Sequence, residues 1–88
     1  MSVILIFIMI ELQESVNVWV ALKGNTINPL CFFWRERQIK IEKINLVHTS
    51  KTGTGLFYHF SVSSGSNFYS LLFDITKLKW FLEAVEEG

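Results

Sequence analysis

Cysteine and proline each occur once in this sequence of 88 residues, and histidine occurs twice. The single thiol, Cys31, cannot form an intramolecular disulfide, which fits a reducing cytoplasm. One cysteine and two isolated histidines do not give the ligand spacings of a structural zinc site. We therefore expect a cytoplasmic protein that holds no metal or other cofactor.

Net charge and a long apolar run are also missing. Eight Lys and Arg residues balance eight Asp and Glu residues, so no global field attracts nucleic acid or an anionic membrane. The longest apolar run, VILIFIMI at 3–10, falls short of the about 20 residues that span a bilayer. The residues around this run supply neither the basic start nor the cleavage site of a secretory signal. We therefore expect no membrane partner.

Half of the residues are apolar and 15% are aromatic, which is enough for one packed domain of this size. We divide the chain into an N-terminal apolar extension at 1–14 and a small β domain at 15–88. The run at 3–10 has two interpretations. Either it is a buried or edge β-strand, or residues 1–8 are a miscalled extension and translation starts at Met9.

Alternation of apolar and polar residues predicts most of the secondary structure. The pattern has period two at 16–22, 30–34, 56–62 and 69–73, and turn-forming residues separate these runs at 24–29, 49–55 and 63–67. In the strand after Arg37, the phase slips by one residue near Glu42-Lys43. A slip of this kind predicts a β-bulge, which bends a strand from one layer to another.

The C-terminus admits two structures. Asp74 could cap a helix at 75–86, or Asp74–Lys77 could form a turn before a strand that buries Leu78, Trp80, Leu82 and Ala84. We predict an all-β fold, a five- to six-stranded antiparallel meander forming a small barrel or roll; the alternative is α+β, with the short C-terminal helix on the same sheet. The predicted core comprises Val18, Val20, Phe32, Ile39, Ile41, Ile44, Leu46, Tyr58, Phe60, Leu71, Phe73 and Leu82.

A motif in the middle of the chain carries a family resemblance. Pro29-x-x-Phe32-x-Trp34-Arg35-x-Arg37 precedes an alternating strand that reaches His48, an aromatic hairpin at 57–73, Asp74 and Trp80-Phe81-Leu82. This order resembles a family of small bacterial domains of unknown function with the motif Pro-x-x-Phe-x-Trp-Arg-Gly-Arg. Some of its members are encoded beside Y-family, error-prone DNA polymerases. The resemblance implies a C-terminal strand and an association with DNA repair.

Two residues depart from the family pattern. Glu36 stands where the family has glycine, so a tight turn with positive φ is not expected there. Thr49 stands where the family has a tryptophan after His48. If that tryptophan helps to form a binding surface, this chain has lost part of it.

The candidate binding residues are Trp34, Arg35, Arg37, Trp19 and His48. Two guanidinium groups beside an indole can hold a phosphate or stack on a base. The structural alternative is that each arginine stacks on an aromatic ring or pairs with a carboxylate, and a neutral domain with two arginines favours it. We name no catalytic residue, because a triad drawn from Ser61, His59 and Asp74 has no nucleophile elbow or oxyanion loop.

These features predict a non-catalytic binding or accessory module rather than an enzyme. Aromatic and arginine side chains are typical of protein interfaces, so another protein is the expected partner. The alternative is a small β-barrel that binds single-stranded nucleic acid through its aromatic and arginine side chains.

Overall fold

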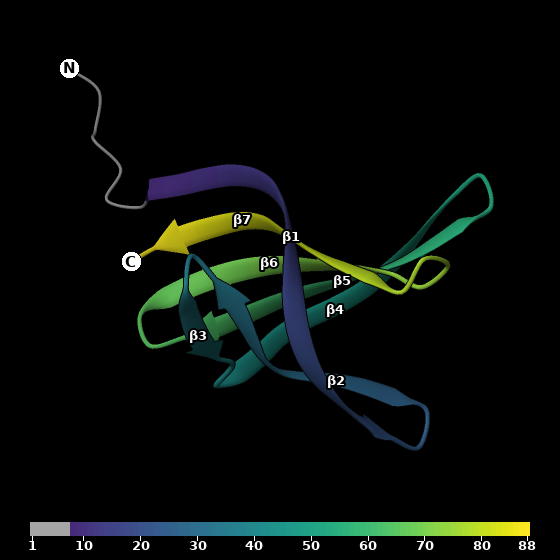
Figure 1. Cartoon of the computed structure of the whole chain (residues 1–88), viewed down its shortest axis with the longest axis horizontal. Helices are drawn as coiled ribbons and strands as arrows, with labels where there is room; N and C mark the ends of the chain where they lie inside the picture. The colour runs from purple at the N-terminus through teal and green to yellow at the C-terminus, as the bar shows by residue number, and fades with distance from the viewer. Residues whose placement is uncertain (1–7) are drawn as a thin grey trace.

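The computed structural model describes residues 8–88. This part of the chain forms one antiparallel sheet of seven strands (Figure 1): β1 (Ile8–Lys23), β2 (Thr26–Trp34), β3 (Arg37–Lys40), β4 (Lys43–Thr52), β5 (Gly55–Ser64), β6 (Asn67–Asp74) and β7 (Lys79–Glu87). The all-β antiparallel prediction is confirmed, although the sheet has seven strands rather than five or six. Residues 1–7, which hold most of the apolar run and part of the predicted extension at 1–14, lie outside the described residues.

The long strand β1 joins the two parts of the sheet. The strand order is β3-β2-β1-β7-β6-β5-β4, so two meanders meet where β1 pairs with β7. Residues 8–16 of β1 pair with β7, and residues 17–23 pair with β2. Register shifts at Glu11/Glu14 and at Trp19/Val20 accompany this change of partner. Such irregularities bend and twist a strand, and they let β1 curl the sheet around its inner face.

A corner between β3 and β4 closes one end of the curled sheet. The Ile41 N–H donates to the Leu30 carbonyl oxygen on β2 at 2.9 Å, whereas the Glu42 N–H donates to the Ser63 carbonyl oxygen on β5 at 2.9 Å. The chain therefore passes here from pairing with β2 to pairing with β5. The predicted bulge lies slightly further on, at the register shift between Ile44 and Leu46. The result is a half-barrel.

Three of the hairpins turn in two residues that begin with glycine. Gly24, Gly53 and Gly65 have φ near 60°, while the residue after each does not have positive φ. This pattern is that of the type II′ turn, which matches the twist of paired strands. One consequence is that the expected loop at 49–55 shortens to Gly53-Thr54, because β4 continues to Thr52.

The C-terminal segment is a strand, and the alternative helix at 75–86 is wrong. β7 pairs with β6 on one side and with β1 on the other, so two ladders of backbone hydrogen bonds outweigh the helical pattern. Oδ1 of Asp74 accepts the N–H groups of Thr76 at 3.0 Å and Lys77 at 3.2 Å, which forms the turn before β7. Leu78 lies in this turn with φ 55° and is exposed rather than buried. Within residues 8–88 no helix is long and apolar enough to cross a membrane.

The core lies on the inner face of the half-barrel. Its buried members are Val16, Phe32, Trp34, Ile39, Phe60, Val62, Tyr69, Leu71, Trp80, Leu82 and Val85, and Val18, Ile41, Ile44, Tyr58 and Phe73 pack against them while partly buried. Ten of the twelve predicted core residues are therefore in or against the core. Leu46 is exposed because the register shift after Ile44 turns it to the outer face. Val20 is exposed because it lies in the projecting part of β1 that pairs only with β2.

Replacing Phe60 by alanine should unfold much of the protein. Its side chain is 2% exposed and lies 5.4 Å from the Trp80 ring, and truncating a buried phenylalanine costs about 3–5 kcal/mol. That is a large share of the free energy of unfolding of a small domain. Thermal and urea unfolding followed by tryptophan fluorescence would measure the loss. Phe68→Ala is the matched control, because Phe68 is 44% exposed and should change little. A Phe60→Ala variant that melts like the wild type would contradict this core.

Candidate binding groove

The turn between β2 and β3 contains Arg35 and Glu36, and Trp34 pairs with Arg37 across it. Both central residues have positive φ, 52° for Arg35 and 62° for Glu36. Positive φ at both positions defines a type I′ turn. The expectation that no tight turn with positive φ forms at Glu36 is therefore wrong. The turn forms, and it keeps two residues with side chains in a conformation that favours glycine.

Trp34 is part of the core and not of an open surface. It is 8% exposed, its indole N–H donates to Oε2 of Glu14 at 2.8 Å, and its ring meets the Tyr69 ring edge-on at 6.4 Å. The Arg35 guanidinium lies over the same indole, 4.6 Å from the ring centroid. Trp34 therefore has no face on which a base could stack. For Trp34 and Arg35 the structural interpretation, a guanidinium stacked on an aromatic ring, is the one that the contacts match.

The predicted site residues do not all share one face with Trp34. Trp19 is 49% exposed and packs against the Phe33 ring at 5.0 Å, with the two rings inclined by 64°. It is paired with Cys31, three residues from Trp34, and therefore points to the opposite face of the strand pair. Arg37 is exposed at the edge strand β3, on the side of its partner Trp34. The candidates are thus distributed over two faces.

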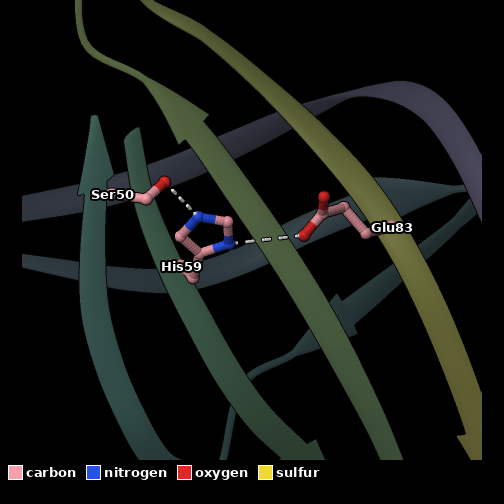
Figure 2. A network of polar contacts seen from close by, with 3 residues as sticks. All are labelled: Ser50, His59 and Glu83. Atoms are coloured by element: carbon pink, nitrogen blue, oxygen red, sulfur yellow. Dashed lines mark hydrogen bonds and ion pairs between the residues drawn. The ribbon is translucent and has the colours of Figure 1, made fainter. Parts of the chain in front are cut away.

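His48 belongs to a polar network on the outer face of the sheet. Its ring stacks on His59, directly opposite on β5, with centroids 4.5 Å apart and planes inclined by 6°. Figure 2 shows His59 between Ser50 and Glu83: Nε2 and the Ser50 hydroxyl are hydrogen-bonded at 2.9 Å, and Nδ1 lies 3.7 Å from Oε1 of Glu83. Glu83 has no partner in the β6–β7 register, and this bulge lets it reach across β6.

The network has the order serine, histidine, carboxylate, but its geometry differs from that of a hydrolytic triad. The 3.7 Å separation of Nδ1 from Glu83 is longer than a hydrogen bond, and it is an ion pair only while His59 is protonated. The backbone N–H groups of a sheet lie in the plane of the sheet, so a carbonyl oxygen resting on this face meets no pair of donors. Asp74, the carboxylate considered for a triad with His59 and Ser61, instead accepts hydrogen bonds within its own turn.

A groove opens on the inner face of the sheet, at the end where the half-barrel is not closed. Beyond the corner at Ile41-Glu42, the β1–β2 and β4–β5 hairpins project and diverge, so that β2 and β4 form the two sides of a V (Figure 1). The groove between them has a volume of about 320 Å³. Its apolar lining comes from Ile27 of β2, Ile44 and Val47 of β4, and Tyr58 and Phe60 of β5; Asn25, Thr26 and Asn28 form its polar rim.

Apolar side chains remain partly open to solvent in this groove. Val47 pairs with the buried Phe60 and so faces inward, yet it is 45% exposed. Val20 and Leu22 are also exposed, and they pair with Pro29 and Ile27, which places them on the groove side of the β1–β2 hairpin. The inner face of the sheet therefore continues past the packed core into an uncovered apolar surface.

None of the predicted site residues lines this groove. Its position follows from two features that period-two alternation does not show, the corner at Ile41-Glu42 and the bulge that exchanges Leu46 for Val47. A signal for His59 was available, because a two-residue turn at Gly53-Thr54 places His48 opposite His59. The turn-forming residues at 49–55 predict a longer loop instead.

Comparison with known proteins finds no relative. No family model matches the chain, and neither the curated proteins nor the solved structures contain a match. The function must therefore be inferred from the chemistry of the groove and of the surfaces around it.

Replacing Glu36 by glycine should stabilise the protein. Glycine adopts φ 62° without the steric conflict that glutamate has there, and the free energy of unfolding should rise by about 1 kcal/mol. Urea unfolding would measure the gain. Lys40→Gly is the matched control, because Lys40 is exposed in β3 without positive φ, and glycine there should destabilise the strand. Equal loss of stability in both variants would contradict the type I′ turn.

Proposed function

We propose that this protein is a non-catalytic binding module that holds a segment of another protein in the groove between the β1–β2 and β4–β5 hairpins. The observation that carries the proposal is that the inner apolar face extends beyond the core and stays uncovered at Val47, Val20 and Leu22. Apolar surface of this kind, rimmed by polar turn residues, is typical of sites that bind proteins.

The composition of the groove favours a polypeptide over a nucleic acid. Its apolar lining is aliphatic apart from Tyr58 and Phe60, and Phe60 is buried, so the groove offers no row of open aromatic faces for bases. The Arg35 guanidinium stacks on the Trp34 ring, so this pair offers no open face to a base. Trp19 and Phe33 meet edge to face rather than as parallel platforms. Single-stranded nucleic acid is therefore the second candidate.

The resemblance to domains encoded beside Y-family polymerases suggests one partner to test first, a DNA-repair protein. The groove itself specifies a chemistry rather than a name. The groove lies between two strands and is not a broad flat surface. It therefore fits a single polypeptide segment that presents apolar side chains.

Selection from a phage-displayed library of random linear peptides tests the proposal. Peptides of about ten residues, the length of one long strand, should be enriched on the full chain and should lose binding to Val47→Glu, which puts a charge into the apolar groove. Leu46→Glu is the matched control on the next residue, since Leu46 is 58% exposed on the outer face, and it should retain binding.

Two results would count against a protein-binding groove. One is a selection that enriches no peptide, or only peptides that bind Val47→Glu as well as the wild type. The other is tight binding of a fluorescent single-stranded oligonucleotide that weakens steeply with salt and is lost in Arg37→Ala or Trp19→Ala. That outcome would favour the nucleic-acid alternative.

A further inference from the structure

The groove is bordered by an edge strand of the sheet. Among the described residues, β4 is one of the two edge strands of the sheet and has ten residues, whereas the other, β3, has four. A strand at an edge presents backbone donors and acceptors that another chain can pair with. An extended peptide that adds to such an edge gains a ladder of hydrogen bonds as well as side-chain contacts.

The geometry points to the residues whose backbone faces the groove. The two-residue turn at Gly53-Thr54 closes with the pair Thr52–Gly55, and in such a hairpin the closing pair is hydrogen-bonded. Pairs then alternate along an antiparallel ladder, so His48, Ser50 and Thr52 bond to β5. The N–H and C=O groups of Val47, Thr49 and Lys51 point the other way, into the open side of the half-barrel.

The β2 side of the groove is less able to pair with an added strand. Pro29 lies in the part of β2 that has β1 as its strand partner, and proline has no N–H to donate. The next residue, Leu30, already accepts the Ile41 N–H through its carbonyl oxygen. An incoming strand therefore forms its ladder with β4 and contacts β2 through side chains such as Ile27.

Among the described residues near the groove, the charged side chains that no other group engages are positive. Val47, Thr49 and Lys51 are spaced two residues apart along β4, so Lys51 lies on the same, groove-facing side as the other two. Lys23 lies at the tip of the facing hairpin, paired with Thr26. The nearby carboxylate, Glu42, accepts the Gly65 N–H at 2.8 Å. β2 contains no charged residue, and β5 contains none apart from the titratable His59. An occupant with a carboxylate opposite Lys51 is therefore favoured over one with a cation.

We propose that the partner segment binds as an added β-strand, antiparallel to β4, with an acidic residue opposite Lys51, a β-branched residue opposite Thr49 and an apolar residue opposite Val47. Antiparallel pairing is the more stable arrangement. From its N-terminus the segment then reads Asp or Glu, any residue, Val, Ile or Thr, any residue, and a large aliphatic residue. This inference rests on the proposed function, because it specifies how the same groove is filled.

A second copy of the chain is a less suitable occupant. The edge β4 of another molecule carries Lys43 and Lys51 and no carboxylate, so pairing of two such edges adds like charges along one ladder. Lysine on an edge strand is a common means of preventing that contact. The charge pattern thus selects an acidic segment of a different chain.

Amide hydrogen exchange measured by NMR on the full chain tests the strand addition, with the tightest peptide from the library selection as the probe. In the free protein, the amides of Val47, Thr49 and Lys51 should exchange quickly, and those of His48, Ser50 and Thr52 slowly. Bound peptide should slow the first set by about tenfold or more and leave the second set unchanged, because only the first set gains partners.

Charge reversal tests the acidic position in the same complex. Lys51→Glu should weaken the peptide by about fivefold to tenfold, and a peptide whose acidic residue is replaced by lysine should bind this variant better than the original peptide does. Lys77→Glu is the matched control, since Lys77 is exposed in the β6–β7 turn and its reversal alters net charge equally. It should leave the affinity unchanged.

The outcomes separate the two proposals. A peptide that is lost in Val47→Glu but leaves the amides of Val47, Thr49 and Lys51 in fast exchange would overturn the strand addition and leave the binding groove intact. Protected amides with no effect of Lys51→Glu would overturn the acidic pattern alone. A selection without any peptide would overturn both.

Discussion

The structure depends on two consecutive backbone groups that bond in different directions. The Ile41 N–H reaches β2 and the Glu42 N–H reaches β5, so a single peptide step ties the two edges of the sheet together. Because the edges are tied at this point, they must diverge beyond it as the strands twist. The half-barrel is closed at the corner for this reason, and the same constraint opens the groove between β2 and β4.

Period-two alternation predicted most strands because nearly every strand has one buried and one exposed face. It gave the right inner face for Phe32, Phe60, Leu71 and Leu82. It failed where the register shifts, since one extra residue exchanges the faces of everything that follows. At Ile44/Leu46 this exchange put Val47 into the groove and Leu46 outside, and alternation alone does not show which residue is the extra one.

The surroundings of the predicted site residues could not be foreseen for a different reason. A tryptophan followed by an arginine reads the same in sequence whether its ring is open or covered. The residues that decide whether the Trp34 ring is covered are distant in the chain. Glu14, 20 residues earlier, accepts a hydrogen bond from the indole N–H, and Tyr69 of β6 packs against the ring. The groove is harder still to foresee, because it is defined by the absence, among the described residues, of a strand beside β4 and not by any residue type.

A small domain gives up stability by leaving Val20, Leu22 and Val47 uncovered, since apolar burial is its main source of folding free energy. The same domain protects the edges beside them, with lysines on β4, a bulge after Ile44 and the proline on β2. Protected strand edges beside an exposed apolar surface favour selective pairing. Indiscriminate pairing is discouraged along the edge, while a strand that brings a carboxylate to Lys51 and an apolar side chain to Val47 meets both requirements at once.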